Sequence, residues 1–195
     1  MAELTTSSYA VLALLGVQPW TTYQLAKQME RSLRTVWPRA ESVIYEQPKK
    51  LVASGHATAS VDHVGRRRST TYAITQKGRR ALRKWLATPG GPPVLEFEAM
   101  LKVAFADLGD LDGLRRNVAA IADMAQAQVE YIADRVREYD ETGGPFPDRL
   151  PVILLVAKFH EERANALQRW AHWAGREIAG WDGVTPATGA AVPAR

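Results

Sequence analysis

Three consecutive arginines, Arg66 to Arg68, are the residues whose type and spacing most clearly indicate a chemical role. They follow Gly65 and lie between residues 56–64 and 70–74, two segments in which small or apolar side chains alternate with polar ones. Such alternation is typical of β-strands, so we expect a hairpin with a turn over residues 65–69. Guanidinium groups gathered at a hairpin tip repel one another but suit phosphate oxygens or a narrow minor groove. A merely solvated loop is the alternative.

A second candidate surface lies on a helix expected from Pro38 to about Val52. At about 100° per residue, Pro48 and Leu51 fall on the same side as Ile44 and form its buried stripe. The opposite side carries mainly basic and polar residues: Arg39, Ser42, Tyr45, Glu46, Lys49 and Lys50. Such a face suits a helix that enters a DNA major groove, although an ordinary solvated helix has a similar composition.

Catalytic and metal chemistry find no support in the sequence. The chain has no cysteine, which excludes disulfides, zinc–thiolate sites and cysteine nucleophiles. The run His160-Glu-Glu-Arg-Ala164 begins like the zinc motif H-E-x-x-H but carries alanine in place of the second histidine. Neither a nucleophile elbow nor a phosphate-binding glycine loop is present. We therefore expect no enzyme activity, cofactor or metal.

Charge divides the chain into two parts. Residues 1–89 hold 14 lysines and arginines against 5 acidic residues, whereas residues 90–195 hold 11 against 16. The change of sign coincides with the proline- and glycine-rich stretch at residues 88–93, which cannot continue a helix. We therefore predict a basic domain over residues 1–88, an acidic domain over residues 94–181 and a disordered tail over residues 182–195. Concentrated positive charge favours a phosphate-bearing partner.

Membrane insertion is not expected, because no apolar run reaches the roughly 18 residues that a spanning helix needs. The sequence also lacks the pattern of a secretory signal, and the absence of cysteine fits the cytosol. We expect a cytoplasmic protein.

The basic part is predicted to contain three helices before the hairpin and one after it. The second helix opens at Thr21, with Gln24 spaced as a capping box, and Thr75 is placed to cap the fourth. This order predicts a mainly α fold: a winged helix-turn-helix with three helices, a β-hairpin wing and a linking helix, followed by a C-terminal α-helical region.

Four runs in this part, in this order and at these spacings, resemble the PadR family of transcriptional regulators. They are Tyr9-Ala-Val-Leu-Ala-Leu-Leu-Gly16, Thr22-Tyr-Gln-Leu25, Ile44-Tyr45 with Leu51 and Gly55, and Tyr72-Ala-Ile-Thr-Gln-Lys-Gly78. The resemblance covers residues 4–88 closely, and the remainder looks like the helical dimerisation region of many members. Two positions depart from the family pattern: Pro48 replaces an apolar residue such as leucine, and Thr22 replaces glycine.

The resemblance implies a dimeric, ligand-responsive repressor that binds a palindromic operator in double-stranded DNA. Tyr23 would brace the unit against the DNA backbone, and the helix and hairpin residues would contact base edges, phosphates or the minor groove. Because Pro48 removes a hydrogen bond within its helix, we expect Lys49 and Lys50 to reach phosphates. The residues assigned to DNA are Tyr23, Arg39, Ser42, Tyr45, Lys49, Lys50, Arg66, Arg67 and Arg68.

The acidic part is predicted to form two long helices, over residues 111–141 and 148–178, packed as an antiparallel hairpin. The first carries an apolar residue about every 3.6 positions, which gives one continuous stripe. We expect this stripe to have surplus area for a second copy, although an internal core would use the same residues. The residues assigned to dimerisation are Leu114, Val118, Ile121, Val129, Ile132 and Val136.

Aromatic residues in the acidic part are candidates for an effector pocket. Tyr131, Trp170 and Trp173 could line a site for a flat hydrophobic or aromatic effector, since some PadR-like proteins sense phenolic acids or drugs. Ordinary core packing is the alternative for each of them. The rival to the whole interpretation is a winged-helix adaptor that binds proteins without DNA, and the three wing arginines argue against it.

Overall fold

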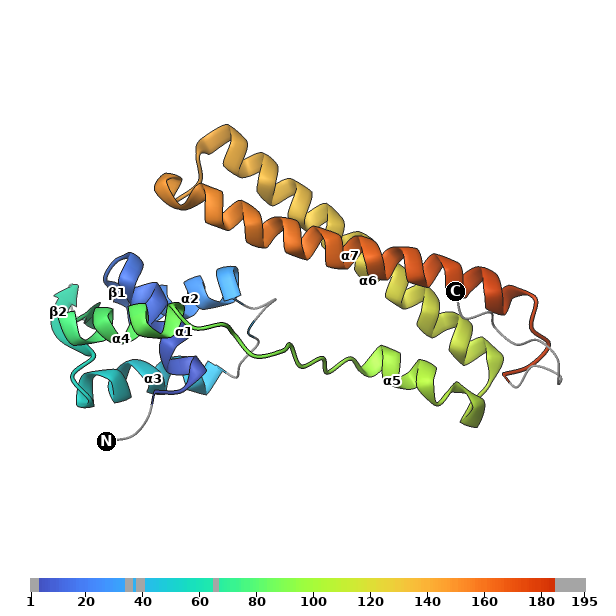
Figure 1. The fold of residues 1–195 in the computed structure, drawn as a ribbon, viewed down its shortest axis with the longest axis horizontal. Coiled ribbons are helices and arrows are strands. Elements are labelled where there is room, and N and C mark those ends of the chain that lie inside the picture. The colour runs from blue at the N-terminus through green and yellow to red at the C-terminus, as the bar shows by residue number, and fades with distance from the viewer. Residues whose placement is uncertain (1–3, 34–36, 38–40, 65–66, 185–195) are drawn as a thin grey trace. The chain divides into compact units, whose positions relative to one another are not determined.

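The computed structural model describes residues 4–33, 37, 41–64 and 67–184. The chain divides into two compact units, unit 1 (Met1–Pro93) and unit 2 (Val94–Arg195) (Figure 1). None of the helices in the described ranges combines the length and the apolar character that crossing a bilayer requires.

Unit 1 has the winged helix-turn-helix order that the sequence predicts. Three antiparallel strands form one sheet in the order β1-β3-β2, with Trp20 opposite Tyr72. The two-residue strand β1 was not predicted, because a strand this short leaves no alternation in the sequence. The elements are α1 (Thr6–Val17), β1 (Trp20–Thr21), α2 (Thr22–Leu33), α3 (Glu41–Ala53), β2 (Ala57–Val64), β3 (Arg67–Ile74) and α4 (Gln76–Leu86).

Side chains just before the helices start them, as local sequence signals predict. The Thr21 amide donates to Gln24 Oε1 at 3.0 Å, and the Gln24 amide donates to Thr21 Oγ1 at 3.2 Å, which confirms the predicted capping box. Thr75 Oγ1 accepts from the Gly78 amide at 3.1 Å and caps α4, also as predicted.

Helix α1 forms the centre of unit 1. Its apolar residues Val11, Leu12 and Leu15 are fully buried, and the helix contacts α2, α3, α4 and β3. Polar and aromatic contacts fix its orientation: Trp20 Nε1 donates to the Leu14 carbonyl at 2.8 Å, and Tyr9 stacks on Trp85 of α4 with ring centroids 4.9 Å apart. A helix that is apolar on most sides needs neighbours on most sides, which is why three helices and a strand surround it.

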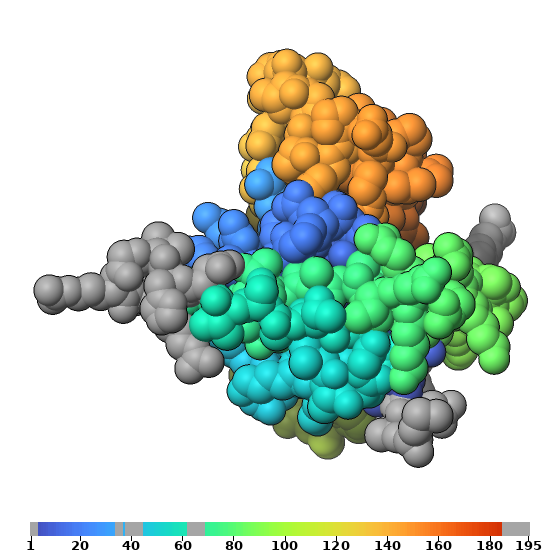
Figure 2. Space-filling model, turned by 90° about the vertical axis from the view of Figure 1, so that its left-hand side faces the viewer, coloured from blue at the N-terminus to red at the C-terminus, as the bar shows by residue number. Residues whose placement is uncertain are grey.

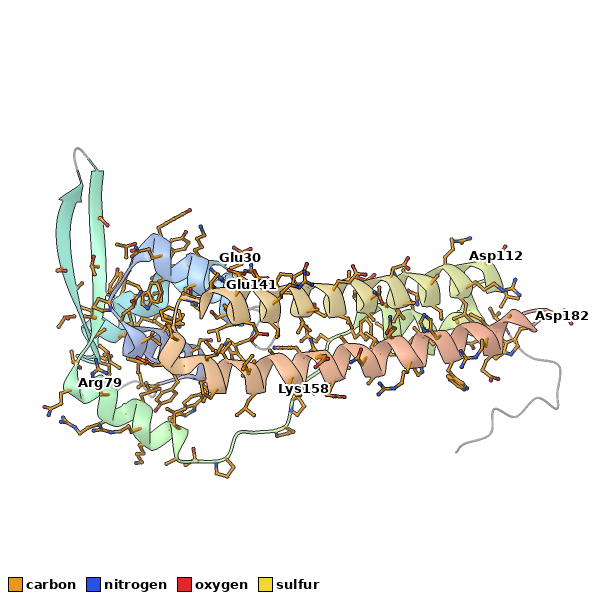
Figure 3. All side chains as sticks on the ribbon, turned by 90° about the horizontal axis from the view of Figure 1, so that it is seen from above. Glu30, Arg79, Asp112, Glu141, Lys158 and Asp182 are labelled. Atoms are coloured by element: carbon orange, nitrogen blue, oxygen red, sulfur yellow. The ribbon has the colours of Figure 1, made fainter. Side chains whose placement is uncertain are left out.

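The wing is longer than the sequence predicts. Val64 pairs with Arg67, so residues 65 and 66 alone connect β2 to β3, and the expected turn over residues 65–69 is wrong. Arg67 and Arg68 are strand residues, because a two-residue connection allows the ladder to continue to its last pair. The hairpin extends away from the helices of unit 1 (Figure 3), and Val61 is 44% exposed.

Unit 2 consists of two long antiparallel helices with short elements beside them. Helices α6 and α7 lie side by side along their length (Figures 1 and 3), as predicted. Asp110 caps the start of α6, and Gly143 in the left-handed region (φ +71°) ends it. The elements are α5 (Glu98–Ala104), the 3₁₀ turn η1 (Ala106–Leu108), α6 (Leu111–Thr142), the 3₁₀ turn η2 (Pro147–Arg149) and α7 (Leu150–Ala179).

The inner face of α7 is lined by small residues. Ala164, Ala171 and Ala174 are buried there, together with His160 and Ile178, against the apolar stripe of α6. The larger apolar residues of α7 lie elsewhere on the helix and are exposed: Val152, Leu155, Val156 and Phe159. Buried alanines allow the two helix backbones to approach closely, so the large side chains are not needed between them.

Gly78 lies in a helix, yet we expect a larger residue at this position to destabilise unit 1. A Cβ at this position would stand 2.2 Å from the His56 carbonyl oxygen, a backbone atom that cannot move aside easily. We expect Gly78→Ala to lower the free energy of unfolding by about 1–3 kcal/mol, the usual cost of overpacking.

The control is Gly175→Ala in α7, where a Cβ would meet open space. Alanine there should stabilise the helix by up to about 1 kcal/mol. Thermal and urea denaturation of both variants measures the two effects, and a Gly78→Ala protein as stable as the parent would contradict the close contact.

Candidate nucleic-acid interface

Helix α3 buries one side and exposes the other as predicted. Pro48 and Leu51 are buried, whereas Tyr45 is 38% exposed and Lys49 and Lys50 are exposed. Part of α3 forms the surface of unit 1 that is coloured cyan in Figure 2. The helix runs from Glu41 to Ala53 without interruption at Pro48. The proline ring contributes to the core, which offsets the backbone hydrogen bond that its missing N–H cannot make.

Two contacts hold α3 against the rest of unit 1. Ser8 Oγ of α1 donates to Gln47 Oε1 at 3.0 Å, close to the middle of α3. At its end, Lys77 Nζ donates to the Ser54 carbonyl at 2.7 Å, and Thr75 Oγ1 donates to the Gly55 carbonyl at 2.8 Å. The start of α4 therefore fixes the end of α3, so the exposed face of α3 is presented by a rigid support.

His56 lies in the same turn. Its Nδ1 is 2.9 Å from Ser54 Oγ, and burial together with the positive charge of Lys77 lowers the pKa of the imidazole. The histidine is therefore neutral at neutral pH and acts as a hydrogen-bonding part of the turn rather than as a cation for phosphate.

The exposed face of α3 is less basic than its composition indicates. Lys49 Nζ lies 2.8 Å from Glu46 Oε1, and this hydrogen-bonded ion pair lowers the pKa of Glu46 and raises the pKa of Lys49. Because both side chains are exposed, the pair contributes little to stability. A phosphate that approaches Lys49 has to compete with Glu46. Lys50 forms no ion pair with a described residue, although its positive charge also helps to lower the pKa of Glu46.

The remaining predicted DNA contacts are described to different extents. Tyr23 is 71% exposed in the first turn of α2, where a backbone-bracing residue must be. Arg39 and Arg66 lie outside the described residues, and of Ser42, Arg67 and Arg68 only the backbone is described, within α3 and β3.

A further row of cations on α4 was not assigned from the sequence. These side chains are exposed, and Arg79 points outward from the helix (Figure 3). The row comprises Arg79, Arg80, Arg83 and Lys84. The sequence shows their spacing, with two cations in each of two successive turns. This spacing does not by itself indicate DNA binding, because a charged outer face is typical of any solvated helix.

In unit 2, the residues assigned to dimerisation pack within one chain. Leu114, Val118, Ile121 and Ile132 are buried against α7, and the other two, Val129 and Val136, are half-buried. The sequence left an internal core as the alternative for this stripe, and the single chain uses these four residues in that way. The apolar area left open for a partner lies on other residues, including Leu155 at 72% exposed.

A cavity of about 240 Å³ lies where α5, η1 and the segment after α7 meet the long helices of unit 2. Trp173 lines it, and Trp170 packs against the neighbouring apolar cluster. Tyr131 does not line it: this residue is on the outside of α6, with the Arg135 guanidinium 5.4 Å from its ring centroid. Trp181 lines the cavity but was not predicted as a site residue, because in the sequence it stands next to the expected tail.

No grouping of acidic or histidine side chains that could hold a metal ion occurs in the described ranges.

Part of the chain is similar to known transcriptional regulators. Residues 11–84 match the family model of the transcriptional regulator PadR-like family. Over 86 residues the chain is 31% identical to a probable transcriptional regulator of Mycobacterium tuberculosis, covering 43% of this chain and 45% of that protein. Over 126 residues it is 28% identical to the negative transcriptional regulator PadR of Bacillus subtilis, covering 60% of this chain and 69% of that protein. The chain thus matches less than half the length of the mycobacterial relative.

Solved structures share the fold. The crystal structure of Bacillus subtilis PadR in complex with operator DNA matches with a TM-score of 0.77 at 21% identity, covering 89% of this chain and 99% of that one. The same protein in complex with p-coumaric acid matches with a TM-score of 0.69 at 20% identity, covering 88% and 98%. At identities this low, the structural matches establish the fold alone: a winged helix followed by a helical extension.

The Glu46–Lys49 pair generates a prediction for binding to any polyanion. Glu46→Gln removes the internal competitor, so Lys49 becomes available and retention on heparin should extend to higher salt. The logarithmic dependence of retention on salt should steepen by about one, the value for one added cation contact. Glu141→Gln, an exposed carboxylate of α6 that changes the net charge equally, serves as control. Equal retention of the two variants would show that the pair does not restrain Lys49.

Proposed function

We propose that the protein is a dimeric, sequence-specific DNA-binding repressor that responds to an effector, because residues 11–84 match the model of the transcriptional regulator PadR-like family. The observation that carries the proposal is the winged helix of unit 1, in which a supported α3 exposes a polar face and a basic hairpin extends beside it. Bacillus subtilis PadR, which has a similar fold, has been crystallised in complex with operator DNA, and this supports DNA binding by the present protein.

The proposed roles of the side chains follow from their places on unit 1. Helix α3 enters the major groove as the recognition helix, with Arg39, Ser42 and Tyr45 toward base edges or adjacent phosphates. Lys49 and Lys50, which follow Pro48, contact phosphates. Tyr23 braces α2 against the DNA backbone, and Arg66 to Arg68 reach the flanking backbone or minor groove.

A dimer gives this arrangement its specificity. Two copies would present two recognition helices about 34 Å apart, one DNA turn, and so require a palindromic site. Because α6 and α7 already cover most of the predicted stripe, we place the interface on the apolar residues that remain exposed in unit 2. On α7 these are Val152, Leu155, Val156 and Phe159. Exposed apolar area of this kind on one helix is typical of a subunit contact.

Repression would follow from occupation of promoter DNA, and release from an effector that changes the dimer geometry. The negative regulator PadR of Bacillus subtilis is similar in sequence, and its complex with p-coumaric acid supports a small aromatic effector as the ligand class. We assign no enzymatic step to the protein and place it in the cytoplasm, where its DNA is. The rival, an adaptor that binds proteins without DNA, would show little affinity for nucleic acid at moderate salt.

The decisive experiment measures binding of the full chain to the DNA upstream of its own reading frame, by gel shift and fluorescence anisotropy at several salt concentrations. We expect tight binding to that DNA and binding several orders of magnitude weaker to unrelated DNA. Equal affinity for both sequences at every salt concentration would overturn the sequence-specific function and favour the adaptor.

The wing arginines should act on all sequences alike. Replacement of Arg66, Arg67 and Arg68 by alanine should weaken operator and random DNA together and reduce the salt slope by about three, because phosphate contacts carry no sequence information. Tyr45→Phe or Ser42→Ala should instead change which sequence is preferred. If the triple-alanine protein bound promoter DNA with unchanged affinity, the wing would not be part of the DNA interface.

The dimer interface can be tested on α7. Leu155→Glu places a charge in the proposed contact and should shift the protein from dimer to monomer, with a large loss of affinity for a palindromic site. His172→Glu puts the same residue at an exposed polar position of α7 and should leave the dimer intact. Analytical ultracentrifugation measures the oligomeric state. A Leu155→Glu protein that remains dimeric would show that the dimer interface does not include this residue.

A further inference from the structure

We propose that the cavity of unit 2 binds an apolar organic cation of single-ring size, and that this cation is the effector of the repressor. The second half of the inference rests on the proposed function, whereas the first half rests on the cavity alone. A volume of about 240 Å³ lies below the range of about 300–1,000 Å³ usual for drug-sized ligands, so a compound with one ring fits better than one with several.

The walls of the cavity are apolar. Residues of α5, α6, α7 and the segment after α7 form them, and several belong to a buried cluster of unit 2. The apolar wall includes Val103, Leu114, Val118, Ala174, Ile178 and Val184. These apolar side chains bind hydrocarbon well and form no hydrogen bond with a polar ligand, so the few polar and charged residues that also line the cavity decide what enters.

That charge is negative. Two of the lining residues are ionisable, and both are acidic: Asp107 of η1 and Glu177 of α7. Neither carboxylate pairs with a base in the part of the chain that the structure describes. Two exposed carboxylates at the mouth of an apolar cavity attract a cation and repel an anion such as a carboxylate.

Arg115, a basic residue near the start of α6, is bound to other partners. Arg115 of α6 lies 3.5 Å from Asp112 and donates to the carbonyls of Ile178, Ala179 and Trp181 at 3.2–3.4 Å. Its guanidinium is therefore used to hold the end of α7 and the segment that follows it. This contact also positions Trp181 over the cavity.

Two indoles complete the site. Trp173 and Trp181 line the cavity from α7 and from the segment after it. The face of an indole carries partial negative charge and is the best aromatic partner for a cation, with a preference that grows when water is excluded. Carboxylates and indoles around one apolar cavity thus favour an ammonium group attached to a ring, a ligand of opposite charge to p-coumarate.

The test titrates the full-length protein with three probes of similar size by calorimetry. They are phenyltrimethylammonium, N,N-dimethylaniline at a pH where it is uncharged, and phenylacetate. We expect the cation to bind at least about 10-fold more tightly than the neutral amine, and the anion least tightly. Equal affinity for cation and neutral amine, tighter binding of the anion, or no binding of any probe because a second copy fills the cavity would each overturn the site.

Matched variants separate the cavity from general electrostatics. Asp107→Asn with Glu177→Gln should reduce the preference for the cation several-fold, to the part that the two indoles supply, while the neutral amine still binds. Asp123→Asn with Glu141→Gln makes the same change of net charge on exposed positions of α6 outside the cavity and should keep the preference. An equal loss in both double variants would contradict a local site.

The effector role is measured on DNA. Phenyltrimethylammonium should weaken binding to the upstream DNA in the parent protein, and a several-fold higher concentration should be needed for the same effect in the Asp107→Asn, Glu177→Gln variant. Binding of the cation with no change in DNA affinity would overturn the effector role. A protein that binds the cation but no DNA would instead overturn the proposed function and leave the cavity site standing.

Discussion

The arrangement of unit 1 depends on the burial of one apolar helix. Val11, Leu12 and Leu15 of α1 are excluded from water, and each apolar side chain of this size contributes about 1.5–3 kcal/mol when fully buried. Because α1 is apolar on most of its circumference, its neighbours are packed around it and cannot shift independently. The exposed face of α3 is therefore held in place by contacts on its hidden side, with Ser8 of α1 also bonded to Gln47.

Charge is placed on this support unevenly. The cations of α4 are exposed, whereas Lys49 on α3 is paired with a carboxylate of the same helix. An interface built in this way would obtain its affinity from elements around α3. The exposed face of α3, whose net charge is closer to zero, would then discriminate between DNA sequences.

Unit 2 separates two kinds of apolar surface. The inner face of α7 is formed mainly by alanines, which allow α6 and α7 to pack closely, while one leucine, two valines and a phenylalanine remain exposed near its start. At the opposite end of α7, the helix and the segment after it enclose a cavity whose charged residues are both acidic. One pair of helices thus provides a core, an open apolar surface and a ligand-sized cavity at different positions along its length.

The sequence by itself determined the features that arise from residues close together in the chain. The Thr21–Gln24 capping box, the cap at Thr75, the long helix from Leu111 and the buried side of α3 were all predicted, because a cap or a helical stripe acts over a few residues. The same holds for the order of elements that defines the winged helix.

Only the tertiary structure decided which surfaces meet. It paired Arg67 with Val64, buried Leu114 in a cluster with Ala174 and Ile178 of α7, and placed Gly78 against the His56 carbonyl. It also brought Trp181 and Asp107 to one cavity, 74 positions apart in the chain. Periodicity shows that a helix has an apolar side, but the partner that covers that side comes from a distant segment, so no local pattern can name it.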